Sequence, residues 1–253
     1  MSYGMYISAE GAQAQSRRLE VIANNLANVN TVGFKPDVAS FQARFAEAIQ
    51  QGEAQSGDRS INNLGGGVKV IDVTTNFAPG QLQRTGNDSD LAIVGNGFFA
   101  VKGGDGQTYL TRAGEFAVDA EGQLVTQNEN RPVLDSAGSP VVLDLEQPWL
   151  VTPDGSVQQG DASVQLALVE PRSIDNFIKV GSNMFRSLSG TVAVPEEQRE
   201  VRSGFLEVSG VNSTDQMMAM IETSRAFEAN SRMIQNHDNT FGTLIGRVLR
   251  NQR

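Results

Sequence analysis

The chain of 253 residues contains no cysteine, one histidine and one tryptophan. Without cysteine it can form no disulfide, no thiolate metal site and no cysteine nucleophile. The sole histidine, His237, leaves one imidazole for general base chemistry and excludes a histidine-rich metal site. Because aromatic residues make up only 6 % of the chain and glycines number 26, we expect an aliphatic core cut by many turns, without a large dry ligand pocket.

Basic charge is also scarce, since 20 Lys and Arg stand against 29 Asp and Glu, a net charge of −9. The ends are nevertheless basic: residues 1–36 carry +1 and residues 225–253 carry +3, so the middle carries −13. An acidic chain produces no field that attracts nucleic acid or anionic lipid. No apolar run approaches the roughly 20 residues that span a bilayer. We therefore expect no nucleic-acid partner and no membrane insertion.

The motifs of common enzymes and binding sites are missing. Gly95-Asn96-Gly97 resembles part of a dinucleotide fingerprint, but a strand pattern follows it instead of a helix, which favours a tight turn. The two acids of Asp88-Ser89-Asp90 lack the spacing of a calcium loop, and the chain has no nucleophile elbow. We predict that the protein is not an enzyme, has no catalytic residues, and uses no cofactor and no metal.

Helical periodicity is present at both ends of the chain. Heptad spacing predicts a narrow, coiled-coil-like seam that serves as an assembly interface, formed by Met5, Ala12, Leu19, Ile22 and Leu26 near the N-terminus and by Met220, Phe227, Ile234, Phe241 and Val248 near the C-terminus. The last helix should begin near Ser213, with Ser213 and Gln216 as a capping box or Asn212 as a competing cap. The alternative is that both helices are ordinary core elements.

Short β-branched and aromatic runs separated by turn residues fill the middle of the chain. The clearest runs are 68–73, 91–94, 98–101, 109–111, 116–118 and 123–125. Regular short spacing without intervening helices predicts antiparallel hairpins that close into a barrel or sandwich. The fold class is therefore α+β. We expect residues 1–36 and 205–253 to form a terminal helical assembly domain, 37–83 an extended connecting segment, and 84–204 a β-rich middle domain.

Three groups of residues in the chain form recognisable motifs. The N-terminal signature comprises Asn24, Asn25, Leu26, Ala27, Asn28, Thr31, Gly33, Phe34 and Lys35. The middle motifs are Asp90-Leu91-Ala92-Ile93, Gly95-Asn96-Gly97-Phe98-Phe99, Thr111-Arg112 and Gly122-Gln123-Leu124-Val125. The C-terminal signature includes Gly204-Phe205-Leu206-Glu207, while Gly210 departs from it by replacing the usual Asn. Together these motifs resemble one family, the bacterial flagellar rod and hook proteins, which residues 150–200 match only loosely.

The resemblance implies a structural subunit of the axial rod that crosses the periplasm, joins motor to hook, transmits torque and encloses an export channel, so that it is required for motility. The implied partners are other rod proteins, further copies of the chain and the flagellar type III export apparatus. The N-terminus lacks the segments of a cleaved secretory signal, which fits that export route. The implied location is the periplasmic rod of the basal body.

Within the family, the chain is too short for a hook protein and too rich in β-structure for the short rod subunits. Arg131-Pro132-Val133-Leu134 and the basic Arg247-Val248-Leu249-Arg250 tail favour the proximal-rod type, while segment 37–83 is compatible with the distal-rod type. The alternative from another class is a secreted β-rich binding module with a helical stalk. That module would be a monomer or a fixed small oligomer, whereas a rod subunit joins stacked neighbours.

Overall fold

The computed structural model describes residues 3–43, 67–174 and 176–250. The chain divides into two compact units. Unit 1 comprises residues 1–27, 37–76 and 212–253, and unit 2 comprises residues 28–36 and 77–211. The chain therefore passes from one unit to the other four times, and a short piece of the N-terminal region, 28–36, belongs to unit 2.

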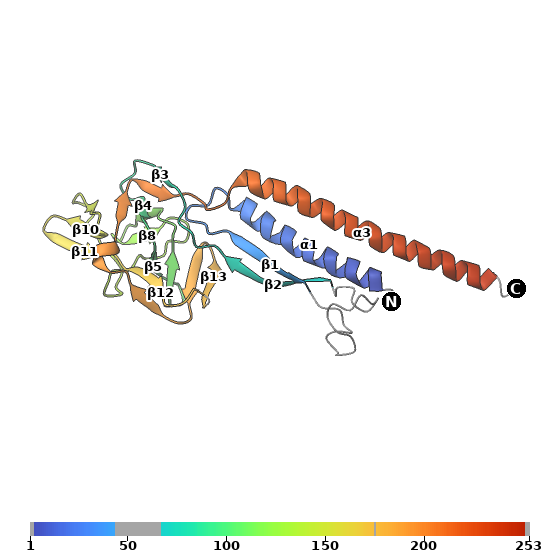
Figure 1. The fold of residues 1–253 in the computed structure, drawn as a ribbon. Helices are drawn as coiled ribbons and strands as arrows, with labels where there is room; N and C mark the ends of the chain where they lie inside the picture. The colour runs from blue at the N-terminus through green and yellow to red at the C-terminus, as the bar shows by residue number, and fades with distance from the viewer. Residues whose placement is uncertain (1–2, 44–66, 175, 251–253) are drawn as a thin grey trace. The chain divides into compact units, whose positions relative to one another are not determined.

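Unit 1 contains the two long helices and one hairpin. Helix α1 (Tyr3–Ala27) and helix α3 (Ser213–Arg250) lie side by side (Figure 1), which confirms the predicted helices at both ends. Strands β1 (Asp37–Ala43) and β2 (Val68–Thr75) pair antiparallel, with a register shift between Ser40 and Phe41, and pack on α1. Neither helix carries an apolar stretch long enough to cross a bilayer in its described residues.

The start of α3 is capped by Asn212. Its Oδ1 accepts hydrogen bonds from the backbone N–H of Thr214 at 3.0 Å and of Asp215 at 3.5 Å. These bonds satisfy donors that the first helical turn leaves without partners. The helix begins at Ser213 as predicted, but the cap is the competing Asn212, because Ser213 already lies inside the helix.

Unit 2 is built from short antiparallel strands. Its main sheet has six strands in the order β13-β14-β6-β5-β12-β15, namely β13 (Phe177–Gly181), β14 (Met184–Ser187), β6 (Thr108–Thr111), β5 (Phe98–Lys102), β12 (Leu168–Pro171) and β15 (Thr191–Ala193). A three-stranded sheet joins β11 (Ala162–Gln165), β10 (Ser156–Gln159) and β9 (Leu150–Val151). The antiparallel pairing in both sheets confirms the predicted β-rich middle of the chain.

Three further pairs complete the β-structure: β16 (Val201–Ser203) with β4 (Leu91–Ile93), β17 (Phe205–Glu207) with β3 (Leu82–Arg84), and β7 (Phe116–Val118) with β8 (Leu124–Thr126). A 3-10 turn, η2, spans Glu196–Gln198. All six sequence runs chosen above fall on strands, and the first of them, 68–73, lies in β2 of unit 1.

No sheet of the described chain closes into a barrel, so that part of the prediction is wrong. The six-stranded sheet ends at β13 and β15 without a further strand beside either. Closure requires strands long enough to tilt and stagger against one another. The strands of unit 2 have two to five residues, because a turn follows each of them too soon for a long ladder to form.

Both faces of the six-stranded sheet are buried at its central strands β5 and β6. Successive side chains of a strand point to opposite faces, and on β5 Phe99 belongs to a large, mainly aliphatic cluster while Phe98 belongs to a smaller one. The smaller cluster is aromatic: the Phe98, Phe177 and Phe185 rings pack with Phe77 at centroid distances of 5.0–6.0 Å. The expected aliphatic core therefore describes only one face.

Candidate functional site

Helix α1 runs antiparallel to α3, and two glycines allow the helices to approach closely. A Cβ added at Gly4 would lie 3.0 Å from His237 Nε2, and one added at Gly11 would lie 3.1 Å from Asn230 Nδ2. Seven residues forward on α1 thus correspond to seven residues backward on α3. A side chain at either glycine would force its neighbour to move.

The side of α3 that faces α1 changes character along its length. The series Thr223, Asn230 and His237, spaced by seven, is polar and at least partly buried. The next member of the series is Leu244, which is 51 % exposed. Since α1 begins at Tyr3, one residue before the glycine that faces His237, no described part of α1 covers Leu244.

Exposed apolar side chains gather at two places on α3. Three lie in its first turns and three near its C-terminal end, and all are 40–60 % exposed: Met217, Met218 and Ile221, and Phe241, Leu244 and Ile245. Monomeric soluble proteins rarely leave apolar side chains gathered in contiguous exposed patches. Helix α3 thus combines a polar contact with α1 and two groups of exposed apolar side chains.

The predicted seam residues are distributed between covered and uncovered positions. Met5, Ala12, Leu19 and Leu26 are half-buried on α1, where Ile22 is buried. On α3, Met220 and Ile234 are half-buried, while Phe227 and Phe241 are 37 % and 40 % exposed. The side chain of Val248 lies outside the described residues.

The N-terminal signature is divided between the two units. In unit 1, Asn25 is buried and exchanges two hydrogen bonds with the backbone of Asp37, at 2.8 and 2.9 Å. In unit 2, Gly33, Phe34 and Lys35 are buried. The two parts of the signature therefore have different surroundings.

The buried part of the signature is held by the backbone of the C-terminal signature. The N–H of Gly33 donates to the carbonyl oxygen of Glu207 at 2.7 Å, and the N–H of Gly210 donates to that of Phe34 at 2.9 Å. Gly33 has φ +65°, and a Cβ there would lie 2.4 Å from the backbone of Arg112, so only glycine fits.

Three charged side chains meet beneath this segment. Lys35 Nζ lies 2.6 Å from Glu207 Oε1, and Arg112 Nη1 lies 3.1 Å from Glu207 Oε2. Each of the three side chains is only 1–2 % exposed. Glu207 Oε1 also accepts the N–H of Gly80 at 2.7 Å, and Lys35 Nζ donates to the carbonyl of Ala78 at 2.8 Å.

The guanidinium of Arg112 completes the cluster. It donates to the carbonyl oxygens of Ile93 at 3.2 Å and Gly95 at 2.6 Å, and it lies over the Phe98 ring with Cζ 5.2 Å from the centroid. The Gly95-Asn96-Gly97 turn, with φ +87° and +111° at its glycines, thus presents a carbonyl to a buried cation. It precedes strand β5, so the turn does not form the dinucleotide site considered above.

Two cations share one carboxylate in this cluster, which we call the Glu207 cluster. Burial lowers the pKa of the Lys35 ammonium, and the hydrogen bond to Glu207 opposes that effect. Burial likewise lowers the pKa of the Arg112 guanidinium, against the attraction of Glu207. Buried charges of this kind persist only where they are paired and hydrogen-bonded. The cluster is closed to solvent, so we assign it a structural role.

The Glu207 cluster brings all three sequence motifs together. Lys35 comes from the N-terminal signature, Arg112 from a middle motif and Glu207 from the C-terminal signature. The sequence marks Lys35 as part of the N-terminal signature but does not reveal its partner Glu207, since no local pattern links residues 172 positions apart. The sequence does hold one signal of a buried ion pair: Lys35 lies between Phe34 and Pro36, and a charge in an apolar segment requires a counter-ion.

The described residues contain no group of three or more His, Asp or Glu side chains placed to hold a metal ion. Asp88 and Asp90, considered above for calcium, lie at the entrance to β4, where Asp90 accepts a 3.5 Å hydrogen bond from Asn87.

Family models match the chain in three places. The model "Flagella basal body rod protein" covers residues 5–35, "Flagellar hook protein FlgE/F/G D1 domain" covers residues 92–166, and "Flagellar basal body rod FlgEFG protein C-terminal" covers residues 202–247. The match continues over nearly the full length of individual proteins. The chain is 34 % identical to the flagellar basal-body rod protein FlgF of Caulobacter vibrioides over 238 residues, 93 % of this chain and 94 % of that protein.

The chain belongs to the flagellar rod and hook family. Within it, the chain is 33 % identical to the rod protein FlgG of Bacillus subtilis, over 97 % of this chain and 98 % of that protein. It is 32 % identical to FlgF of Mesorhizobium japonicum, over 93 % of each. Membership in the FlgF and FlgG rod proteins confirms the resemblance drawn from the motifs, and the relatives named here are structural rod proteins.

Proposed function

We propose that this protein is a structural subunit of the periplasmic rod of the flagellar basal body. Its terminal helices join copies of the chain and other rod proteins in a helical axial assembly, and the β-rich middle forms the outer layer. The assembly transmits torque from motor to hook and encloses the export channel, and the proposal includes no catalytic step. The subunit leaves the cytoplasm through the flagellar type III apparatus without a cleaved signal.

The observation that carries this proposal is the uncovered apolar end of α3. Phe241 and Leu244 continue two heptad-spaced stripes of α3 beyond His237, the residue that faces Gly4 of α1, and they are 40 % and 51 % exposed. A neighbouring subunit's helices can complete this stripe, which a single chain leaves open. Heptad-spaced contacts of this kind are those of a coiled-coil seam. The same seam would bury Met5, Ala12 and Leu19, which are half-buried in one chain.

We further propose the proximal-rod position, with the distal rod as the alternative. The proximal assignment rests on Arg131-Pro132-Val133-Leu134 and on the basic tail Arg247-Val248-Leu249-Arg250. Relatives named FlgF and FlgG match almost equally well, at 34 % and 33 % identity. Electron cryomicroscopy of isolated basal bodies, with the chain identified by its side-chain density, distinguishes the two positions.

Substituting Phe241 with aspartate tests the assembly surface. Phe241→Asp places a charge where an apolar contact should form, so we expect loss of swimming and basal bodies without a complete rod, while the protein is made and exported normally. Asn239→Asp, on an exposed position of the same helix, adds the same charge and should leave swimming intact. Normal soft-agar spreading by the Phe241→Asp strain would contradict the proposed seam.

A further inference from the structure

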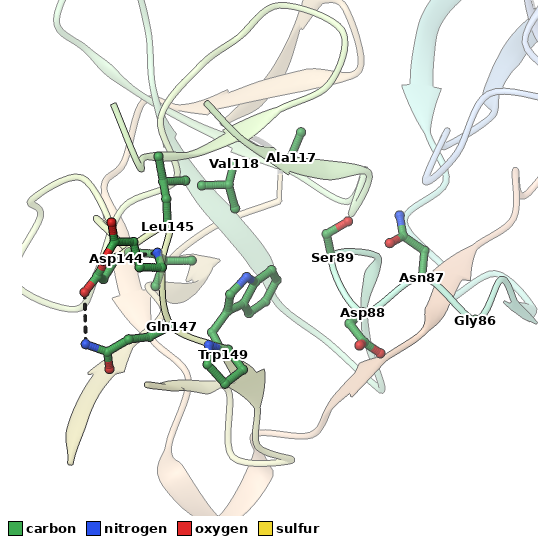
Figure 2. A pocket seen from close by; sticks show the side chains of 13 residues that line it. Gly86, Asn87, Asp88, Ser89, Ala117, Val118, Asp144, Leu145, Gln147 and Trp149 are labelled. Carbon is green, nitrogen blue, oxygen red and sulfur yellow. Dashed lines mark hydrogen bonds between the residues drawn. The ribbon is translucent and has the colours of Figure 1, made fainter. Parts of the chain in front are cut away.

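Unit 2 contains an open hollow of about 750 Å³ whose lining includes no residue of the Glu207 cluster. Three segments surround it: the turn 86–89, part of β7, and the loop 143–149 (Figure 2). Residues from all three segments line the hollow, among them Trp149, the only tryptophan of the chain.

The inner wall of this hollow is apolar. The indole of Trp149 stands between the 87–89 turn and the side chains of Val118 and Leu145 (Figure 2). Trp149 is partly buried against the large aliphatic cluster, whereas Leu145 is 62 % exposed. An indole face and an exposed leucine provide contact area for the aliphatic part of an incoming side chain.

The rim of the hollow is acidic and holds no positive charge. Its lining includes three carboxylates, those of Asp88, Asp144 and Glu146, and no Lys or Arg. Asp144 accepts hydrogen bonds within its own loop, from the N–H of Glu146 at 3.0 Å and from Gln147 Nε2 at 2.9 Å. Within the described residues, Asp88 and Glu146 form no ion pair.

Charge decides which ligand suits this arrangement. Unit 2 has ten Lys and Arg against eighteen Asp and Glu, a net charge of −8, so it repels nucleic acid and anionic lipid. A tryptophan beside polar side chains also suits a neutral sugar ring. Three carboxylates without a cation, however, favour a ligand that brings positive charge, and the indole is the best aromatic partner for a cation.

We propose that the Trp149 hollow is a docking site for a basic segment of a partner protein. One Lys or Arg side chain of that segment lies with its aliphatic stem against Leu145 and its cationic group over the indole of Trp149. The carboxylates of Asp88 and Glu146 pair with that cation or with a neighbouring one. The site goes beyond the proposed function, since it shares no residue with the helical seam.

Trp149 makes the proposal directly measurable. Because the chain has one tryptophan, fluorescence excited selectively at that tryptophan reports the hollow alone. The dilute full-length protein is titrated with three probes: acetylated tetra-arginine amide, acetylated tetraglutamate amide and chitotetraose. We expect a saturable change in emission with tetra-arginine alone, weakened by added salt because rim charges are screened. Saturation with chitotetraose, or no saturation with tetra-arginine, overturns the proposal.

Paired variants separate the hollow from general charge. Asp88→Asn combined with Glu146→Gln should weaken tetra-arginine binding about fivefold, as expected for two partly exposed charge pairs. Glu196→Gln combined with Glu197→Gln removes the same charge from the exposed turn η2 and should leave affinity unchanged. Equal weakening by both pairs shows non-specific attraction and overturns the proposal. Far-ultraviolet circular dichroism verifies that both variants fold.

Discussion

At the scale of single residues, the most demanding position in the chain is Glu207. It neutralises two buried cations, accepts a backbone N–H, and supplies its own carbonyl to Gly33. Removing one partner of a buried ion pair is far more costly than removing an exposed one, because the remaining charge stays desolvated. The same carboxylate on the surface would contribute little.

Glu207→Gln should therefore lower the free energy of unfolding strongly. The amide keeps the shape but leaves Lys35 and Arg112 without a counter-ion, a loss of about 3–5 kcal/mol. Urea unfolding followed by Trp149 fluorescence measures it. Glu200→Gln, in an exposed pair with Arg202, is the control and should cost less than about 1 kcal/mol. Similar values for both variants would show that the cluster does not stabilise unit 2.

A second residue, Glu115, should make the free energy of unfolding fall as pH rises. A carboxylate whose pKa is lowered on folding has the opposite effect. Burial, and then the nearby charge of Asp90, raise the pKa of Glu115 above 4.5. Between 4.5 and the raised value the folded state binds the proton more tightly, so the free energy of unfolding falls as pH rises. Above that window Glu115 is charged in both states, and the partial burial of its charge lowers the free energy of unfolding.

Glu115→Gln should accordingly stabilise the protein at pH 7, by less than about 1 kcal/mol because the side chain is partly exposed. The gain should disappear as pH falls below 4.5, where the wild-type carboxyl becomes protonated in both states. Thermal unfolding across this pH range measures it. The exposed Glu121→Gln serves as the control and should show no such trend. A gain that persists at low pH would contradict the assignment.

At the scale of elements, a glycine between β6 and β7 sets how closely the chain approaches β4. A Cβ added at Gly114 would lie 1.6 Å from the carbonyl oxygen of Leu91, and the N–H of Leu91 donates to the Gly114 carbonyl at 3.0 Å. This contact needs glycine for space and not for a positive φ. It joins the Asp90–Ile93 motif to the segment that carries Arg112.

Gly114→Ala should lower the free energy of unfolding by at least about 1–3 kcal/mol, because the backbone of β4 has to move. Gly104→Ala is the matched control, since an added Cβ there meets nothing within 4 Å and the substitution should be nearly neutral. Urea unfolding of the two variants compares them. Equal stability would indicate that β4 can shift without cost.

The elements themselves could largely be predicted from the sequence. The helix beginning at Ser213 and the strands at 91–93, 98–102 and 116–118 follow from periodicity and turn residues. Whether the sheet closes into a barrel could not be predicted. The pairing of β12 with β5 and β15 is decided by contacts between residues distant in sequence. The aromatic cluster was missed for the same reason, as Phe77 and Phe177 become neighbours only after folding.

At the scale of the whole molecule, helix α3 is longer than the partner it has within one chain. Its part beyond His237, which faces Gly4, has no described α1 residue opposite. An isolated helical segment of about a dozen residues is marginally stable in water. We therefore expect this helix end to be less stable in the monomer than the β-rich unit.

Hydrogen exchange should show this difference. In the dilute monomer, amides in residues 239–250 should exchange fast and those of β5 and β6 slowly, because the sheet is buried on both faces. On polymerisation, the same amides of α3 should become protected. Strong protection of 239–250 in a proven monomer would show that the helix end needs no neighbour.

The separation of Lys35, Arg112 and Glu207 along the chain also has a temporal consequence. A polypeptide that emerges from its N-terminus presents both cations before their shared anion, which comes near the end of the chain. Until Glu207 arrives, burying Lys35 and Arg112 is unfavourable. Unit 2 should therefore complete its fold only after residue 207 has emerged, so the order of residues along the chain delays its closure.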